Sequence, residues 1–381
     1  MPMGLRFLPD TDFSFDGISN FTFGITESCN MRCRYCCFSG DYAGMRAHSS
    51  ARMSEHTINK AIAFVSWHAH PTDGISVSFY GGEALLEFDA ICNIITELRT
   101  IFGSRLTCDI STNGLLLSEE VIDRLCLLPD TGISVSLDAS PEIHDSRRTN
   151  PDGSPTYRRI VRNLSRFKEK YPEEYQRRVR LMVTFESLHE LELANASYSR
   201  FEALAGQKGI HISRVMPNFD KSIYLPDSVE SKRRTLRDAL RKRNLGIRDF
   251  HALWLADLER KVTKRFDMND GCGNIRLHSC LNSLYSIFIT SDGSLYPCEK
   301  FGTDCSIGNL DSGIDRLKLK KLAIRYTLRR QVMCGTCPLV EFCGRCLADM
   351  KLNAADMRLM CNDYKNDIIN YLEFHEAGVR L

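Results

Sequence analysis

The sequence lacks the features of a membrane-bound or exported protein. No run of about 18 apolar residues occurs along its length. Residues 1–6 are followed by acidic residues rather than by an apolar signal segment. The formal net charge is only +2 at pH 7, so composition gives no reason to expect nucleic acid or an anionic membrane as a partner. These absences predict a cytoplasmic protein.

Cysteine, in contrast, is abundant, with 16 in 381 residues. Because cytosolic thiols are kept reduced, so many cysteines point to metal or cluster binding rather than to disulfides. One group lies within residues 29–37, and nine more lie between residues 272 and 361. Three isolated cysteines in apolar stretches are predicted to be small core residues: Cys92, Cys108 and Cys126.

Short β-rich runs alternate with amphipathic stretches over residues 21–217. The expected strands are residues 21–26, 75–80, 106–111, 132–137, 179–185 and 210–216. The expected helices are residues 55–68, 86–101, 119–126, 157–170 and 192–204. Alternation of this kind implies a parallel sheet with right-handed crossovers. Eight such units would close a full barrel, so six predict an α/β fold with an open, partial (β/α)6 TIM-like barrel.

Chemically distinctive residues follow the ends of these strands. The first cysteine group follows strand one, and Gly81-Gly82-Glu83 follows strand two. Ser111-Thr112-Asn113-Gly114 comes next, and Ser136-Leu137-Asp138 closes strand four. Each of the glycine-containing motifs could be a plain turn. Because barrel active sites form at the carboxyl ends of the strands, their agreement favours one shared site.

Cys29, Cys33 and Cys36 lie within eight residues of sequence. Three thiolates at this spacing can bind three irons of a 4Fe–4S cluster and leave the fourth iron open for another molecule. The alternative is a zinc site. Zinc would need a fourth ligand, and the local candidate, Cys37, is adjacent to Cys36, which makes joint tetrahedral ligation awkward.

The spacing CxxxCxxC, with an aromatic residue (Tyr35) before the last cysteine, resembles the motif of the radical S-adenosylmethionine (SAM) enzymes. In that family SAM binds the open iron through its amino and carboxylate groups. One electron from the cluster then breaks the sulfonium bond and gives a 5'-deoxyadenosyl radical. The resemblance therefore implies SAM and a 4Fe–4S cluster held by Cys29, Cys33 and Cys36.

The same resemblance assigns the SAM-binding residues. They are Tyr35, Gly81, Gly82, Glu83, Ser111, Asn113, Ser136 and Arg148. Two glycines let the chain approach a ligand closely, and Glu83 offers an acceptor to the SAM ammonium. Arg148 is expected to contact the SAM carboxylate. Arg147 competes for that role, and either arginine could instead pair with Asp145 or Asp152.

The C-terminal cysteines resemble the SPASM domain of peptide-modifying radical SAM enzymes, which holds two auxiliary 4Fe–4S clusters. By this resemblance the first cluster is bound by Cys272, Cys280, Cys298 and Cys346. The second is bound by Cys334, Cys337, Cys343 and Cys361. One departure is that two residues separate Cys343 from Cys346 where the common pattern has three. The alternative is a zinc ribbon made from Cys334, Cys337, Cys343 and Cys346.

Three further residues have open roles. Glu299 follows Cys298, and in anaerobic sulfatase-maturating enzymes an aspartate at the corresponding position is the proposed base. Glu299 is therefore a candidate acid or base, with a structural hydrogen bond as the alternative. Cys37 and Cys305 are each either a hydrogen or proton donor or an inert buried thiol.

The expected domain order follows from these assignments. Residues 1–20 form an N-terminal extension, 21–225 the radical SAM barrel, 226–268 a helical bridge, 269–361 the SPASM domain and 362–381 a C-terminal helix. The bridge is strongly basic, so its charges either face solvent or hold an acidic peptide.

The function that this resemblance implies is a maturase of a ribosomally made peptide, forming a thioether or carbon–carbon crosslink. Such an enzyme needs a precursor peptide or protein, a reductant such as flavodoxin or ferredoxin, and a means of binding the leader. With only residues 1–20 before the first strand, a separate leader-binding protein or the chain's own basic bridge is expected to do this. The alternative enzyme is an anaerobic sulfatase maturase that makes formylglycine from Cys or Ser. The alternative of another class is a multicluster electron carrier or a zinc-stabilised module.

Overall fold

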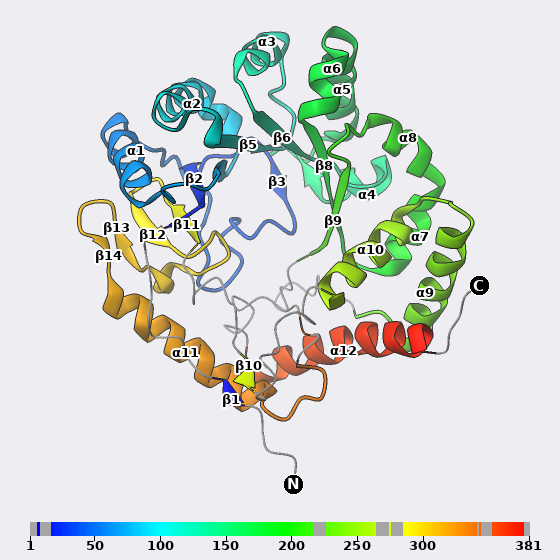
Figure 1. The fold of residues 1–381 in the computed structure, drawn as a ribbon. Coiled ribbons are helices and arrows are strands. Elements are labelled where there is room, and N and C mark those ends of the chain that lie inside the picture. The colour runs from blue at the N-terminus through cyan, green and yellow to red at the C-terminus, as the bar shows by residue number, and fades with distance from the viewer. Residues whose placement is uncertain are drawn as a thin grey trace.

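The computed structural model describes residues 6–7, 17–215, 226–263, 274–275, 285–340, 343 and 353–376. Its centre is a ten-stranded sheet in the order β14-β13-β12-β11-β2-β4-β5-β6-β8-β9 (Figure 1). The six parallel strands that alternate with helices are β2 (Asn20–Thr26), β4 (Ile75–Gly81), β5 (Leu106–Thr112), β6 (Thr131–Ser136), β8 (Val179–Phe185) and β9 (Ile210–Arg214). The expected open α/β barrel is confirmed.

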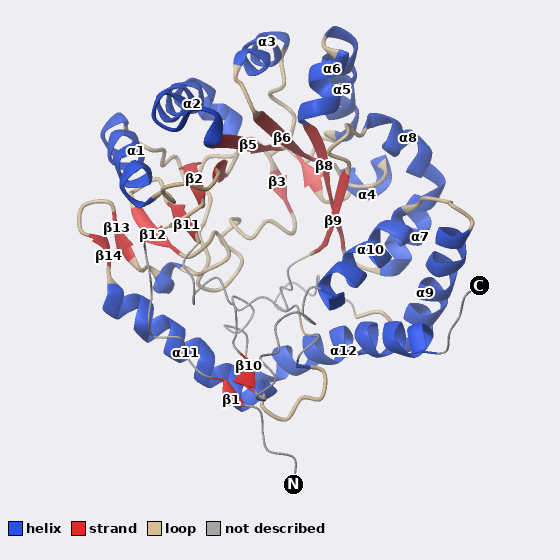
Figure 2. Ribbon diagram, in the orientation of Figure 1, coloured by secondary structure: helices blue, strands red, loops and turns tan. Residues whose placement is uncertain are grey.

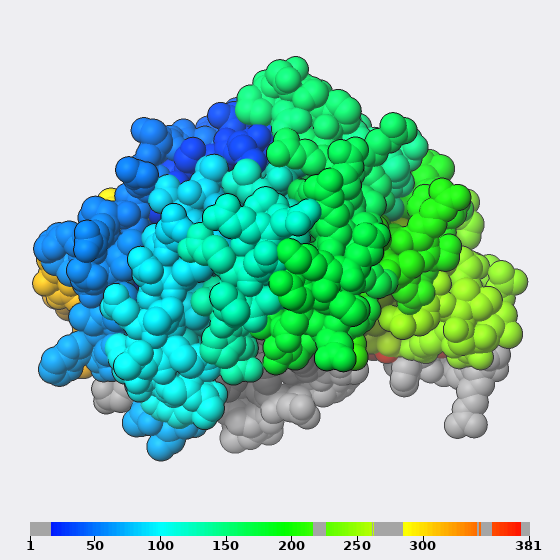
Figure 3. All heavy atoms as spheres, turned by 90° about the horizontal axis from the view of Figure 1, so that it is seen from above, coloured from blue at the N-terminus to red at the C-terminus, as the bar shows by residue number. Residues whose placement is uncertain are grey.

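Helices cover the outer side of the sheet (Figure 2). They are α1 (Glu55–His68), α2 (Phe88–Phe102), α3 (Glu119–Leu127), α5 (Tyr157–Lys170), α6 (Pro172–Arg178), α7 (Leu188–Ala194) and α8 (Tyr198–Leu204). Side chains along β4 alternate between the two faces of the sheet. Ile75, Val77 and Phe79 are fully buried in the core, whereas Ser76 and Ser78 face the other side and are half-buried. In the view of Figure 3 the barrel segments follow one another in chain order across the surface.

Two expected helices differ from the structure. The helix expected over residues 192–204 is wrong, because α7 and α8 are separated by a 3-10 turn, η3 (Asn195–Ser197). Asn195 accepts a hydrogen bond from the Phe250 amide there (3.0 Å), which ties the break to a distant helix. The helix expected from residue 86 begins as a 3-10 turn, η1 (Ala84–Glu87), and continues as α2.

The C-terminal part of the chain extends the barrel sheet. Its strand β11 (Ser286–Ile289) pairs in parallel with the free edge of β2, with Ser286 opposite Asn20. The antiparallel strands β12 (Ser294–Tyr296), β13 (Gly308–Asn309) and β14 (Gly313–Ile314) follow. A separate two-stranded pair joins β1 (Arg6–Phe7) to β10 (Asn274–Ile275). The cysteine-rich part therefore covers an otherwise exposed strand edge.

Four helices complete the described chain. They are α9 (Val229–Asn244), α10 (Phe250–Thr263), α11 (Arg316–Cys334) and α12 (Ala354–Glu376). Gly246, with a positive φ of 70°, separates α9 from α10 within the basic bridge. The helix expected from residue 362 begins earlier, because the Asn353 side chain accepts hydrogen bonds from the Ala355 and Asp356 amides. In Figure 1, α11 and α12 lie across the open side of the sheet.

Four smaller elements lie near the strand ends. They are β3 (Arg32–Cys33), α4 (Pro141–Asp145), β7 (Arg148–Thr149) and η2 (Gly103–Arg105). In the described residues, no helix combines the length and the apolar character needed to cross a membrane.

Candidate active site

The first cysteine group lies in a segment that directly follows β2, residues 27–37, which we call the cysteine loop. Cys29, Cys33 and Cys36 are half-buried there. Burial raises the pKa of Cys29 to about 11 and that of Cys36 to about 12, and it also raises the pKa of Cys33. The neighbouring thiols add smaller contributions in the same direction to the pKa values of Cys29 and Cys36. The loop thus gathers three thiols that a bound metal would have to deprotonate.

A backbone amide and a histidine ring nitrogen lie beside these thiols. The Met31 amide donates to Cys29 Sγ (3.4 Å). The Nε2 atom of His48 lies 3.7 Å from Cys36 Sγ. Sequence reasoning did not find His48, because nothing in the pattern marks a lone histidine that approaches the thiol only through folding.

The glycine pair brings the end of β4 against the start of the cysteine loop. The Gly82 amide donates to the Thr26 carbonyl (2.8 Å), and the Glu83 amide donates to the Ser28 carbonyl (2.8 Å). Gly81 has a φ of +134°, which side chains disfavour. A Cβ atom on Gly82 would lie 2.1 Å from the Ser28 carbonyl oxygen. Close approach between the two segments therefore requires glycine.

Replacing Gly82 by alanine is expected to displace the cysteine loop, because the new methyl group would overlap the Ser28 backbone. The expected cost is about 1–3 kcal/mol of unfolding free energy, measured by chemical denaturation, together with a loss of iron from the loop. Gly74→Ala is the matched control, since a Cβ there meets nothing nearer than 3.7 Å. Equal behaviour of the two variants would contradict this account of the glycine pair.

Glu83 joins the ends of β4 and β5. Its side chain is buried and accepts hydrogen bonds from Thr112 Oγ1 (2.5 Å), the Asn113 amide (2.7 Å) and the Leu85 amide (3.1 Å). Burial raises its pKa, while the bonds from Asn113 and Thr112 oppose that shift. Asn113 in turn donates to Asn30 Oδ1 in the cysteine loop (2.7 Å). One network therefore links the loop to two strand ends.

Ser111 and Ser136 lie on the inner face of the sheet at the carboxyl ends of β5 and β6. Ser111 on β5 is paired with Ser134 on β6. Ser136 lies two residues after Ser134, so its side chain is on the same face of the sheet. Both side chains are half-buried. Their placement agrees with a shared site at the strand ends.

Tyr35 and Arg148 bond to each other. Arg148 donates to the Tyr35 hydroxyl (2.7 Å), which donates to Asp138 Oδ2 (2.9 Å). Arg147 pairs with Asp138 (3.0 Å) and with Glu190 (2.7 Å). The expected alternative pairing with Asp145 or Asp152 is not found among the described residues. Asp145 instead accepts from the Thr156 and Tyr157 amides, and Asp152 accepts from Ser154.

Comparison with known proteins agrees with this geometry. The model of the Radical SAM superfamily matches residues 24–194, which span the cysteine loop, the glycine pair and the ends of β5 and β6. Residues 24–194 are therefore a Radical SAM domain. Radical SAM enzymes use SAM and a 4Fe–4S cluster.

Curated relatives match most of this radical SAM chain. A cysteine-type anaerobic sulfatase-maturating enzyme of Clostridium novyi is 24% identical over 343 residues, which is 84% of each chain. A serine-type anaerobic sulfatase-maturating enzyme of Klebsiella pneumoniae is 24% identical over 364 residues, covering 89% of this chain and 84% of that one.

Solved structures share the fold. Native anSMEcpe with bound AdoMet and Cp18Cys peptide aligns with a TM-score of 0.68 at 17% identity, covering 93% of this chain and 96% of that one. Streptococcus suis SuiB bound to S-adenosylmethionine aligns with a TM-score of 0.56 at 13% identity, covering 86% and 72%.

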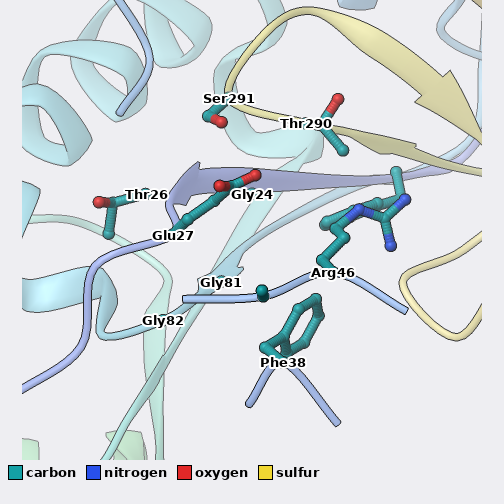
Figure 4. Close-up of a pocket in the computed structure, with 11 residues that line it drawn as sticks. Gly24, Thr26, Glu27, Phe38, Arg46, Gly81, Gly82, Thr290 and Ser291 are labelled. Carbon is teal, nitrogen blue, oxygen red and sulfur yellow. The ribbon is translucent and has the colours of Figure 1, made fainter. Parts of the chain in front are cut away.

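A small hollow of about 10 Å³ lies beside the glycine pair, between the start of the cysteine loop and β11 (Figure 4). It is lined by Gly24, Thr26, Glu27, Phe38, Arg46, Ala47, Gly81, Gly82, Phe288, Thr290 and Ser291. Arg46 crosses to the C-terminal strands, where it donates to the Phe301 carbonyl (3.2 Å) and stacks over the ring of Tyr296 at 4.2 Å. No sequence pattern predicts this contact between the barrel and the C-terminal part of the chain.

Glu299 lies at the same end of the barrel as the cysteine loop. Its backbone carbonyl accepts from Arg46 (3.4 Å), and its side chain is partly exposed. Burial raises the pKa of Tyr80 at the end of β4, and the charges of Cys37 and Glu299 add to that shift. Cys37 itself packs against a small cluster formed by Tyr42, Met45 and Val215. Glu299 and Cys37 therefore both face the region of Tyr80.

The described auxiliary cysteines gather at the end of α11. Successive turns bring them together, with the Cys337 amide donating to the Cys334 carbonyl (2.9 Å) and the Cys343 amide to the Val340 carbonyl (3.2 Å). Burial raises the pKa of Cys334 to about 11, and the nearby Cys343, Cys361 and Cys337 thiols contribute in the same direction. Of the other expected set, Cys298 is half-buried beside Glu299. Cys272, Cys280 and Cys346 lie outside the described residues.

The remaining cysteines are placed by packing. Cys305 is buried, with Arg325 at 3.0 Å and Tyr326 at 3.8 Å from its Sγ atom. Cys108 is buried in the core as expected, while Cys92 and Cys126 are only partly buried against it. This packed environment favours the interpretation of Cys305 as an inert buried thiol.

The basic residues of α9 are engaged within the chain. The ion pairs are Lys232 with Asp363 and Asp367, Arg233 with Glu373, Arg234 with Glu192, Arg241 with Asp238, Lys242 with Asp238 and Asp249, and Arg243 with Glu259. Arg237 lies over the Phe374 ring at 5.9 Å. These contacts favour a bridge that packs against α12 rather than one that holds an acidic peptide.

Proposed function

We propose that this radical SAM enzyme oxidises a polypeptide and that Cys29, Cys33 and Cys36 bind its SAM-cleaving 4Fe–4S cluster. The observation that carries the proposal is the bonding of the cysteine loop to the ends of β4, β5 and β6. Three thiols on one loop fit a cluster with one open iron. When bound, the cluster and SAM supply an electron and a 5'-deoxyadenosyl radical.

The SAM-binding roles are carried by the strand ends. Glu83 uses three of its roughly four acceptor positions within the protein, so one remains for the SAM ammonium. Gly81 and Gly82 leave room for close approach of a ligand. The remaining SAM contacts are Tyr35, Ser111, Asn113, Ser136 and Arg148. Burial at the strand ends excludes water from the group that reacts.

Two auxiliary 4Fe–4S clusters complete the proposed cofactor set of three. Proximity of Cys334 to Cys337, Cys343 and Cys361 supports the second of them, because Cys361 joins this set through α12. The first would use Cys272, Cys280, Cys298 and Cys346. A zinc ribbon would need Cys346 in place of Cys361, and the proximity of Cys361 favours the cluster assignment.

Glu299 is the proposed acid or base. It follows Cys298 and lies near Tyr80 at the carboxyl end of the barrel, where a carboxylate can accept a substrate proton. Cys37, in the same region, is a second candidate donor. Glu299→Gln tests the role of Glu299 as acid or base. The variant is expected to cleave SAM as the wild type does but to form less product.

The two candidate reactions differ in the bond that forms. Formylglycine formation from Cys or Ser is supported by the sulfatase-maturating relatives, which align along most of the chain. Thioether or carbon–carbon crosslinking of a ribosomally made peptide is supported by the C-terminal cysteine pattern, which resembles that of peptide-modifying radical SAM enzymes. Either reaction needs an external reductant such as flavodoxin or ferredoxin, and crosslinking also needs a leader-binding partner.

Mass spectrometry of peptide products decides between these reactions. The reconstituted enzyme, SAM and dithionite are incubated anaerobically with a sulfatase-derived Cys or Ser peptide and with a peptide encoded next to the gene. An aldehyde in the first peptide identifies formylglycine formation, and loss of two hydrogens from the second identifies crosslinking. If SAM is cleaved but both peptides stay unchanged, the proposal of a polypeptide substrate of these classes is wrong.

A further inference from the structure

Asp138 lies just after β6 and connects three segments of the chain. Its side chain is fully buried. It accepts hydrogen bonds from the Tyr35 hydroxyl (2.9 Å), Arg147 Nε (3.0 Å) and the Thr184 amide (3.0 Å). Its own amide donates to His144 Nδ1 (3.1 Å). The cysteine loop, the segment after β6 and the end of β8 therefore meet at one carboxylate.

Tyr35 is the contact that belongs to the cysteine loop. It stands between Cys33 and Cys36, and its hydroxyl both donates to Asp138 and accepts from Arg148 (2.7 Å). An aromatic ring alone would satisfy the motif, but only tyrosine can make these two bonds. The Tyr35 hydroxyl thus makes two hydrogen bonds that an aromatic ring alone could not make.

Arg147 and Arg148 place positive charge beside the cysteine loop. Arg148 is opposite Cys33 in the antiparallel pairing of β3 with β7. The Arg147 carbonyl accepts from the Arg34 amide (2.8 Å). Arg147 and Arg34 both pair with Glu186 on the other side.

We propose that Asp138 is a positioning residue for the SAM-cleaving cluster, which through Tyr35 and Arg147 fixes the loop between Cys33 and Cys36 and holds Arg148 beside Cys33. This inference rests on the proposed function. Groups that hold metal ligands in place commonly change metal affinity or activity by roughly 10- to 100-fold when removed. The hydrogen bonds of the Asp138 side chain go to Tyr35, Arg147 and the Thr184 amide, so its effect on the cluster acts through Tyr35 and the arginines.

Tyr35→Phe is the sharpest test, because it keeps the ring and removes only the bridging hydroxyl. Tyr175→Phe is the control, since Tyr175 is also a tyrosine with a bonded hydroxyl, is fully buried, and donates to the Leu204 carbonyl away from the loop. Asp138→Asn removes the charge and keeps the shape. The reconstituted holoenzymes are compared by the electron paramagnetic resonance (EPR) spectrum of the reduced clusters with and without SAM, and by the rate of SAM cleavage.

Tyr35→Phe is expected to alter the SAM-dependent EPR signal and to lower the cleavage rate roughly 10-fold, with Asp138→Asn lowering it further and Tyr175→Phe unchanged. If Tyr35→Phe matches the wild type in both readouts, the positioning role is wrong, whether or not Asp138→Asn folds. If the wild type itself gives no SAM-dependent signal, it is the proposed function that fails. The two failures are therefore distinguishable.

Discussion

Replacing Cys33 by alanine is expected to abolish production of 5'-deoxyadenosine from SAM. Cys33 stands in the middle of the cysteine loop, paired through the backbone with Arg148, and its thiol is one of three available to the cluster. With two thiolates left, the loop can no longer hold the cluster. We expect the variant to lose about four iron atoms per chain, measured by iron analysis after anaerobic reconstitution.

The control for this substitution is Cys108→Ala. Cys108 is buried in the core on β5, so its replacement changes a thiol without touching the loop. It should retain the iron and the SAM cleavage of the wild type. Retention of full SAM cleavage by Cys33→Ala would contradict the assignment of the cysteine loop.

Replacing Lys232 by methionine is expected to lower the free energy of unfolding by about 3–5 kcal/mol. Lys232 is 1% exposed, and its ammonium lies 2.7 Å from Asp363 Oδ1 and 2.7 Å from Asp367 Oδ1. Burial already raises the pKa of Asp367 to about 6, although Lys232 opposes the shift. Without the ammonium, Asp367 would remain buried without its counter-charge and Asp363 would keep only its ion pair with Arg214 (2.8 Å), on the helix that carries Cys361.

The measurement is anaerobic chemical denaturation of the reconstituted protein. Lys60→Met is the matched control, because Lys60 pairs with the exposed Asp311 at the surface and such pairs contribute about 0–1 kcal/mol. A second variant, Lys232→Met with Asp367→Asn, should recover part of the loss, since it removes one buried charge. If Lys232→Met costs no more than Lys60→Met, the buried ion pairs of Lys232 do not hold α12 to α9.

The barrel was predictable because its signals are local. Alternation of apolar residues defined β4 and β8 to within a residue, and the glycine pair and the cysteine loop each stand directly after a strand. The position of β11 was not predictable, since pairing with the edge of β2 joins residues more than 250 positions apart. The early start of α12 depends on the capping side chain of Asn353, a signal present in the sequence but not used.

The site followed the same division. The ligand types and the strand-end motifs could be identified from their spacing in the sequence. The groups that hold them in place could be identified only in the folded structure. His48 reaches Cys36, and Arg46 reaches the strands that precede Glu299, through contacts that no local pattern encodes. Asp138 was visible in sequence only as the last residue of a strand-end motif. Its three bonds to separate segments gave it a role that spacing could not.

Production of 5'-deoxyadenosine by the wild-type enzyme tests the central claim most directly. The protein is reconstituted anaerobically with iron and sulfide and given SAM and dithionite, and the product is followed by chromatography beside Cys29→Ala. The account predicts 5'-deoxyadenosine from the wild type and none from the variant. A fully loaded wild type that makes none, even with candidate peptides present, would contradict the account and would favour an electron carrier or a structural metal protein.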